Sequence, residues 1–275
     1  MKRIFQIFAF IVLLFSNPAF TVNAQHCYSK NITFLPEEEL IYIVAYDWFV
    51  IWTEVGEVTL KITEESYEGT PSYHFTAEGE TYKTWDWIFK VRDKFETYVE
   101  KETLKPLYFG RNVREGNYRQ IEKTWFNFHD SLTYTEVTTN DNPTYKDTIP
   151  ITPCTFDILS GLLYARNIDF SNYHEGDTIP VNIVLDKKLY PIYFRYLGVE
   201  DIKIRRIGTF ECIKFSVMLI EGEMFHEGEN MTVWATNDEN HIPIYAESPI
   251  LIGSVKVKIS HVKNIRYPIT SLKQK

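Results

Sequence analysis

The sequence predicts a mainly β protein: a strongly curved antiparallel sheet with one central amphipathic helix. The sheet is expected to be an open or closed barrel-like meander of one or two layers. Short segments in which apolar and polar residues alternate recur along the chain between turn-forming residues. Aromatic residues, which favour strands, make up 16% of the chain. Only residues 155–167 show a strong helical period.

The first 24 residues are predicted to form a secretory signal peptide and not to belong to the fold. Lys2 and Arg3 give a positive start, an apolar run covers 4–15, and small residues precede Gln25. The apolar run is about twelve residues long, shorter than the roughly 20 that span a bilayer as a helix. The mature chain, 25–275, has no longer apolar run, so we expect no transmembrane segment in it. The protein is therefore expected to be exported to the periplasm or the outer membrane.

Composition and length limit which partners the protein can bind and how many domains it can form. The formal net charge is −8 and no cluster of basic residues occurs, so the chain is not expected to bind nucleic acid or anionic lipid. The mature chain is long enough for one large domain with a sizeable core. Two β halves, about 30–150 and 168–265, joined by the helix at 155–167, are the alternative organisation.

The first predicted strand contains the aromatic stretch "YDWFVIW". Leu40–Val55 is predicted to form one long, bent strand. Period-2 alternation places the rings of Tyr46, Trp48 and Trp52 on one face and mostly aliphatic side chains on the other. Because both faces are apolar, both must be covered. The rings are therefore predicted to face the hollow of the curved sheet, where they line a site for an apolar ligand or, alternatively, pack against core side chains.

The following segments complete the prediction. A short helix is expected at Thr84–Arg92, whose Trp85 and Trp87 are further candidates for lining the ligand site. Residues 138–148 are polar and have no period, so they are expected to form a loop. The other predicted strands are 57–64, 73–79, 95–100, 106–112, 118–127, 132–138, 178–185, 189–199, 201–207, 210–220, 230–236, 242–247 and 254–262.

The segment "CTFDILSGLLYARNI" predicts the central helix. Ile158, Leu159, Leu162 and Leu163 make one apolar stripe along it. Thr155 or Asp157 is expected to cap its start, while a cation near its end, Arg166, interacts favourably with the helix dipole.

An internal similarity links two predicted hairpins. Residues 98–109 and 234–246 both consist of a strand, an acidic turn, a proline, an aliphatic residue and a tyrosine. Shared turn chemistry explains this similarity, and a duplicated β-layer is the alternative.

The three cysteines all remain in the mature chain and enter a compartment where disulfides form. Cys154 and Cys212 are the candidate disulfide pair, and buried free thiols are the alternative. The spacing of the cysteines, which include Cys27, matches no metal-binding or redox motif.

No catalytic residue, metal ligand or cofactor site is predicted. Ser160-Gly161 lacks the preceding glycine of a nucleophile elbow and lies in the helical segment. Residues 221–230 place four glutamates around His226, a pattern more typical of a solvated hairpin than of a cation site.

Four stretches resemble one family of exported bacterial proteins, the domain of unknown function 3108 (DUF3108). They are "EELIYIVAYDWFVIWTEVGEVTL" near the start, then 93–111, "FDILSGLLYAR" (156–166) and 236–259. The first departs from the family pattern, because Glu38-Glu39 replaces the usual Gly-Glu. The resemblance implies a β-rich envelope protein with no assigned reaction and no catalytic residues. More loosely, the family is similar to the open barrels of periplasmic lipoprotein carriers.

Three functional classes follow. The first is a noncatalytic envelope protein that binds an apolar or amphipathic ligand, such as a lipid or a lipoprotein acyl chain, in the hollow of the sheet. The second is a structural or assembly factor that binds another envelope protein, and the third is a hydrolase with an unrecognised site. An apolar cavity of a few hundred Å³ or more supports the first class. A filled core with an exposed apolar patch supports the second, and a cleft with perturbed carboxylates or histidines supports the third.

Overall fold

A computed structural model describes residues 27–48, 51–140, 142–219, 228–249 and 253–274. The predicted signal peptide, 1–24, and most of the glutamate-rich segment at 221–230 lie outside these residues. The elements are β1 (Glu39–Trp48), β2 (Ile51–Tyr67), β3 (Thr70–Thr81), β4 (Arg92–Glu100), β5 (Pro106–Glu115), β6 (Tyr118–Asn127), β7 (Leu132–Thr139), β8 (Tyr145–Pro150), β9 (Thr155–Phe156), α2 (Ile158–Arg166), the 3-10 helix η1 (Phe170–Asn172), β10 (Thr178–Leu185), β11 (Lys188–Ile204), β12 (Gly208–Leu219), β13 (Gly228–Thr236), β14 (Pro243–Pro249), β15 (Ser254–Lys263) and β16 (Leu272–Gln274).

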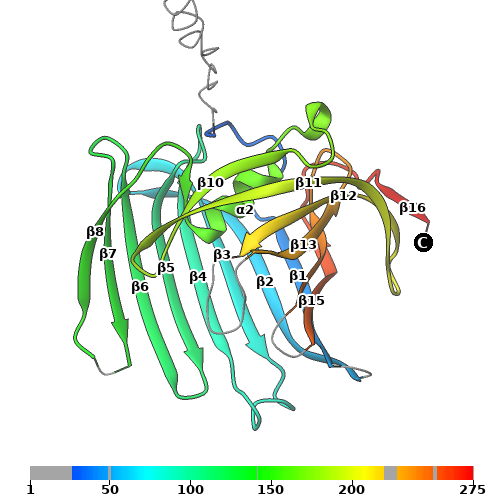
Figure 1. Ribbon diagram of the computed structural model, residues 1–275, viewed down its shortest axis with the longest axis horizontal. Helices are drawn as coiled ribbons and strands as arrows, with labels where there is room; N and C mark the ends of the chain where they lie inside the picture. The colour runs from blue at the N-terminus through cyan, green and yellow to red at the C-terminus, as the bar shows by residue number, and fades with distance from the viewer. Residues whose placement is uncertain (1–26, 49–50, 141, 220–227, 250–252, 275) are drawn as a thin grey trace, which may run out of the picture.

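One curved sheet contains all of the described strands (Figure 1). Its order is β8-β7-β6-β5-β4-β3-β2-β1-β15-β14-β13-β12-β11-β10-β9, and β16 pairs with β12. Every pairing is antiparallel except that of β9 with β10. The edge strands are β8 and β9, so the sheet is open. The predicted fold class, a curved antiparallel sheet with one central helix, is confirmed.

The sheet curls around α2. The end of the sheet that contains β10–β12 crosses the strands of the other end, and α2 lies between them (Figure 1), in contact with β3, β4, β9 and β10. Leu159 and Leu163 join the core formed with β1–β4, while Tyr164 and Ala165 join a second core under β10–β13. Ile158, in contrast, is exposed. Side chains on opposite sides of the helix therefore fill the space enclosed by the curved sheet.

Asp157, one of the two predicted caps, caps the start of the helix in the structure. Its side chain accepts hydrogen bonds from the backbone N–H groups of Leu159 and Ser160, and Ser160 Oγ accepts one from the N–H of Asp157. These bonds satisfy donors at the helix start that have no partner within the helix. A further hydrogen bond to Asp157 Oδ2, from Thr97 Oγ1 on β4 (2.8 Å), ties the helix to the sheet.

Side-chain contacts hold the curl together where the strands do not pair. The turn between β10 and β11 places Asp186 beside Arg111 on β5, with which it forms an ion pair. Arg111 Nε also lies 2.8 Å from Glu122 on β6, whose side chain is fully buried. Gln120 donates a hydrogen bond to Asp186 (3.0 Å), and Lys187 lies over the ring of Tyr145 on β8. The turn is thus fixed against β5, β6 and β8.

The prediction of a single strand over Leu40–Val55 is wrong. Trp48 pairs with Ile51 and Asp47 with Trp52, so β1 and β2 are two antiparallel strands. The two residues between them in the sequence are Phe-Val, which lack the glycine, asparagine or aspartate that mark most tight turns. The sequence therefore contains no signal for the reversal.

Three other predicted elements need correction. Residues 83–88 form successive turns instead of a helix, with hydrogen bonds such as Ile88 N–H to the Trp85 carbonyl. The predicted loop at 138–148 is shorter, because β8 begins at Tyr145. The predicted strands 189–199 and 201–207 are one strand, β11, with an irregularity between Tyr196 and Val199 where Gly198 has φ +91°. The contacts between Asp86 and Arg92 hold residues 83–88 in turns, although the apolar residues there have helical spacing.

The two similar hairpins have the same local register. Tyr98 pairs with Tyr108 and Val99 with Pro106 between β4 and β5. Between β13 and β14, Trp234 pairs with Tyr245 and Ala235 with Pro243. In both hairpins the aliphatic residue between proline and tyrosine is the extra residue of a bulge.

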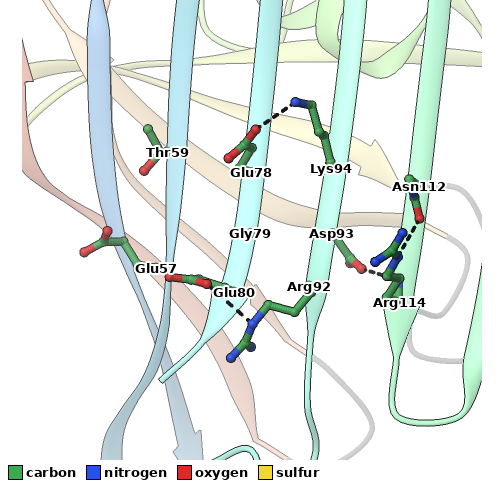
Figure 2. A pocket seen from close by; sticks show the side chains of 10 residues that line it. All are labelled: Glu57, Thr59, Glu78, Gly79, Glu80, Arg92, Asp93, Lys94, Asn112 and Arg114. Carbon is green, nitrogen blue, oxygen red and sulfur yellow. Dashed lines mark hydrogen bonds and ion pairs between the residues drawn. The ribbon is translucent and has the colours of Figure 1, made fainter. Parts of the chain in front are cut away.

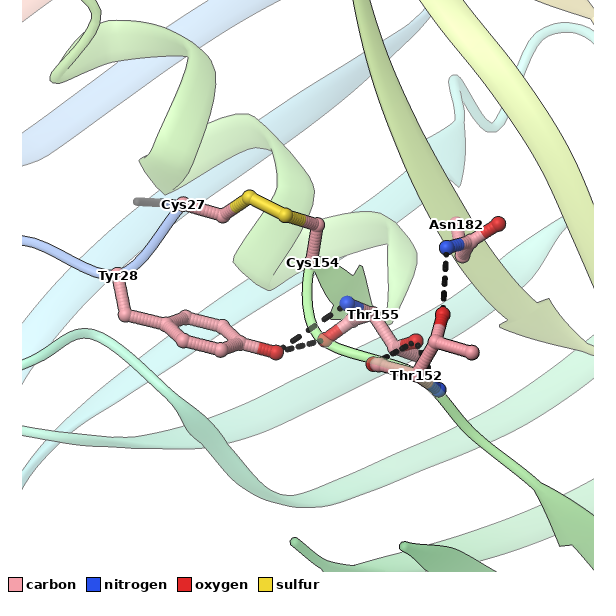
Figure 3. Close-up of a disulfide and its surroundings, with 6 residues drawn as sticks. All are labelled: Cys27, Tyr28, Thr152, Cys154, Thr155 and Asn182. Atoms are coloured by element: carbon pink, nitrogen blue, oxygen red, sulfur yellow. Dashed lines mark hydrogen bonds between the residues drawn. A yellow bond between two sulfur atoms is a disulfide. The ribbon is translucent and has the colours of Figure 1, made fainter. Parts of the chain in front are cut away.

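The disulfide joins a different pair of cysteines from the predicted one. Cys154 is bonded to Cys27, with their Cα atoms 5.2 Å apart (Figure 3). Cys212 is free and buried. The Cys154–Cys212 prediction is therefore wrong, because Cys212 packs in the core with β16 nearby while Cys154 lies just before β9. Tyr28 extends this attachment of the N-terminal segment: its hydroxyl accepts a hydrogen bond from the N–H of Thr155 and donates to the Thr155 carbonyl, each at 3.2 Å.

Candidate functional site

An apolar cavity of about 650 Å³ lies on the inner face of the sheet. Side chains from five neighbouring strands, which alternate onto the same face, form its wall. The wall residues are Val44 and Tyr46 on β1, Val58 on β2, Ala77 on β3, Phe95 on β4 and Val255 on β15. Cavities of this size hold drug-sized organic ligands, and an apolar wall favours an apolar part of such a ligand.

The connection between β3 and β4 forms the mouth of the cavity. Trp85, Ile88, Phe89 and Val91 of this connection line the cavity. Ile88 and Phe89 are also more than half exposed to solvent, so apolar surface continues from the cavity to the outside.

An ion pair fixes the shape of this connection. Arg92 Nη2 lies 2.7 Å from Asp86 Oδ2, and Thr81 Oγ1 donates a hydrogen bond to Asp86 Oδ1 (2.7 Å). Arg92 also donates to the Thr81 carbonyl (3.1 Å). The hydrogen bonds from Thr81 and Arg92 lower the pKa of Asp86, so the carboxylate stays ionised at neutral pH.

The five aromatic residues predicted to line a ligand site are not brought together on one face. Tyr46 and Trp85 line the apolar cavity. Trp52 lies on the opposite face from Tyr46, because Trp52 pairs with Asp47 while Tyr46 pairs with Thr53. Trp87 is 81% exposed, and the side chain of Trp48 lies outside the described part of the structure. A ligand-lining role for these residues stays a prediction.

Sequence reasoning missed most of the cavity wall. Val58, Ala77, Phe95 and Val255 are ordinary strand residues whose alternation predicts only that they face inward. The shared face could have been found only with the strand order, because β15 pairs with β1 across more than 200 residues of chain.

A carboxyl group faces the cavity. Asp93 on β4 lines it, accepts a hydrogen bond from the N–H of Arg114 (2.8 Å), and lies beside the carboxyl group of Glu115. Partial burial raises the pKa of Asp93, and burial together with the nearby Asp93 raises that of Glu115. Two coupled carboxyl groups therefore lie at one side of an otherwise apolar site.

A second, charged pocket of about 380 Å³ lies along β2–β5 (Figure 2). Its charged side chains pair with one another: Glu78 with Lys94 (3.0 Å) and Glu80 with Arg92 (3.5 Å). Such exposed pairs are typical of the solvated face of a sheet. This pocket shows no nucleophile beside a base, so it gives no support to a hydrolase.

A buried polar network joins the stretches that carry the family resemblance. Arg166, at the end of α2, forms an ion pair with Glu38, and their side chains are only 3% and 1% exposed. Arg166 also donates to the carbonyl oxygen of Asn240 (3.1 Å), and His241 Nδ1 donates to the carbonyl oxygen of Arg166 (2.8 Å). These residues come from three of the four stretches, and Thr97, which binds Asp157, comes from the fourth. Residues from all four stretches therefore attach the helix to the sheet, and one of them, Glu38, stands where the family usually has glycine.

This network predicts a pH dependence of stability. Burial lowers the pKa of His241, and the charge of Arg166 lowers it further. The hydrogen bond to the Arg166 carbonyl oxygen and the charges of Asp238 and Asp169 partly offset the shift. The unfolded chain, with a histidine pKa of about 6.5, therefore takes up a proton at higher pH than the folded protein. The free energy of unfolding should fall as the pH drops below about 6.5, by at most about 1.4 kcal/mol per pH unit.

Urea denaturation of wild type and His241→Asn tests this, since asparagine tolerates the positive φ at this position (44°). Between about pH 7.5 and about pH 5.5 the wild type should lose roughly 1 kcal/mol more than the variant. Equal losses in the two proteins would show that His241 does not titrate differently on folding.

Within the described residues, no group of three or more histidine, cysteine, aspartate or glutamate side chains is arranged to hold a metal ion. Nor does any helix in the described ranges have the length and apolar character needed to cross a membrane.

Comparison with known proteins identifies the family. A family model for a protein of unknown function, DUF3108, matches residues 41–260. Among solved structures, the chain is similar to a beta-barrel-like protein of domain of unknown function DUF1849 from Brucella abortus. The TM-score is 0.56 at 8% sequence identity, and the match covers 86% of this chain and 100% of that chain. No curated protein matches the sequence. At this identity the structural likeness shows a shared fold alone, whereas the family model covers most of the sequence: the chain belongs to the DUF3108 family.

Proposed function

We propose that this protein is a noncatalytic, exported envelope protein that binds an apolar or amphipathic ligand, such as a lipid or a lipoprotein-like acyl chain, in the hollow of its curved sheet. The apolar cavity of about 650 Å³ carries this proposal. Residues of the sheet and of the β3–β4 connection enclose it, and its apolar surface reaches solvent at Ile88 and Phe89. The predicted signal peptide supports export to the periplasm or the outer membrane.

A second candidate is a structural or assembly factor that binds another envelope protein. The exposed side chains of Trp87, Ile88 and Phe89 favour it, because adjacent exposed apolar residues mark interaction sites. Since Ile88 and Phe89 also line the cavity, we assign this surface first to ligand entry.

Filling the cavity without disturbing the fold tests the proposal. Gly79 lines the cavity, and a Cβ atom added there would have Val58 Cγ2 as its nearest neighbour, at 3.7 Å, which is ordinary van der Waals contact. Gly79→Phe should therefore place a ring in the cavity while β3 remains intact. We expect binding of the apolar fluorophore N-phenyl-1-naphthylamine to weaken by roughly tenfold or more.

The control is Glu78→Phe, which adds the same ring to the opposite face of the same strand. It removes only an exposed ion pair with Lys94, worth little to stability. The proposal predicts that this variant binds the fluorophore as the wild type does. Equal binding by wild type and Gly79→Phe, with both folded, would mean that the cavity is not the binding site.

A further inference from the structure

A basic groove adjoins the apolar cavity. The groove, about 920 Å³, is lined by Trp52, by residues of the β11–β12 turn and by Lys258 of β15. Trp85 lines both the groove and the apolar cavity, so the two hollows are adjacent at this side chain.

The groove concentrates positive charge in an acidic protein. Lys203, Arg205 and Arg206 are exposed, and none of them forms an ion pair with a carboxylate in the part of the chain that the structure describes. The groove also contains Lys258 and Glu54, which pair with each other (2.6 Å). Three cations therefore have no carboxylate partner among the described residues, although the net charge of −8 predicts no affinity for anionic lipid.

Trp52 gives the groove an amphipathic wall. Its side chain is 45% exposed, and the ammonium groups of Lys256 and Lys258 lie 5.2 and 5.7 Å from its ring centroid. Tryptophan beside cations is suited to the boundary between an apolar chain and a charged head group.

We propose that the ligand is an amphiphile with an anionic, phosphate-type head group. Its apolar chain lies in the cavity, its head group lies in the groove among Lys203, Arg205 and Arg206, and it passes Trp85 between them. The carboxyl group of Asp93 faces the cavity itself, so an anionic head is favoured in the groove and disfavoured inside. This inference rests on the proposed function, since it names the ligand class of the same hollow.

Displacement of bound N-phenyl-1-naphthylamine by amphiphiles with one chain length and different heads tests the inference. Dodecyl phosphate should displace the fluorophore at a lower concentration than dodecanol, and dodecylamine should be the weakest competitor. Inorganic phosphate alone should not compete, because it lacks the chain. High salt should reduce the advantage of dodecyl phosphate.

The matched variants are two triple substitutions. In Lys203→Ser/Arg205→Ser/Arg206→Asn the groove loses its unpaired cations, and asparagine suits the positive φ of Arg206 (69°). This variant should bind dodecyl phosphate roughly tenfold more weakly and dodecanol unchanged within about twofold. The control, Lys123→Ser/Lys146→Ser/Lys188→Ser, removes three cations that line neither hollow and should leave both affinities unchanged.

The outcomes separate this inference from the proposed function. If dodecyl phosphate and dodecanol compete equally with wild type, or if both triple variants lose the same affinity, the head-group assignment is overturned and the apolar site stands. If inorganic phosphate binds as tightly as dodecyl phosphate, the groove is a phosphate site independent of the cavity, which also overturns it. If the fluorophore does not bind to the wild type at all, the proposed function itself fails.

Discussion

Arg166→Met should destabilise the protein by about 3–5 kcal/mol, the largest effect that we expect from a single substitution. The change leaves the carboxylate of Glu38, only 1% exposed, without its counter-charge. It also removes the hydrogen bonds from Arg166 to the carbonyl oxygen of Asn240. Chemical denaturation of the two proteins measures the difference.

The double variant Glu38→Leu/Arg166→Met separates the ion pair from the packing around it. Because replacing both members of a buried ion pair by apolar residues is often nearly neutral, the double variant should recover much of the lost stability. If Arg166→Met melts like the wild type, the ion pair does not have the buried environment described here.

Removal of the Cys27–Cys154 disulfide is the second large effect that we expect. The bond joins residues 127 positions apart, so it limits the freedom of the unfolded chain strongly. Cys27→Ser/Cys154→Ser should lower the free energy of unfolding by about 2–5 kcal/mol. The residues that pack on the bond, such as Tyr28, should become easier to digest with protease, because the bond holds them covalently against the segment before β9.

A reducing agent provides the control for the disulfide. It should destabilise the wild type by a similar amount and leave Cys27→Ser/Cys154→Ser unaffected, since Cys212 is already a free thiol. Destabilisation of both proteins by the reducing agent, or of neither, would contradict the assigned pairing.

Local patterns predicted much of this fold. The leucine stripe, the Asp157 cap and the terminal Arg166 all follow from the spacing of residues within one helix. Alternation located most strands to within a few residues, and the repeated bulge at Pro106 and Pro243 was visible as a repeated tripeptide pattern. These features depend on neighbours along the chain, which a sequence shows directly.

Features set by distant parts of the chain were not predictable in the same way. The pairing of Cys27 with Cys154 depends on where the N-terminal segment crosses the helix, and the sequence contains nothing that selects it over Cys154 with Cys212. The β1–β2 reversal carries no turn residues, so the rings of Tyr46 and Trp52 were assigned to one face although the hairpin separates them. The missing information was strand order and register.

The candidate site combines both kinds of feature. Tyr46 and Trp85 lie in stretches of the sequence that are unusually rich in aromatic residues, and both line the cavity. The basic residues at 203–206 have no comparable signal, since three cations near a hairpin turn are ordinary in a sequence. Their position beside Trp52 and next to the apolar cavity is set by the folded sheet.

The most direct test of the ligand-binding hollow is native mass spectrometry of the protein purified after export from its own host. Wild-type protein should carry a bound small molecule, seen as a mass above that of the mature chain, which extraction with organic solvent removes. Gly79→Phe, prepared in the same way, should appear at the mass of the chain alone, while Glu78→Phe should retain the adduct. A wild-type protein that is always free of ligand, or a Gly79→Phe protein that carries the same adduct, would contradict the account.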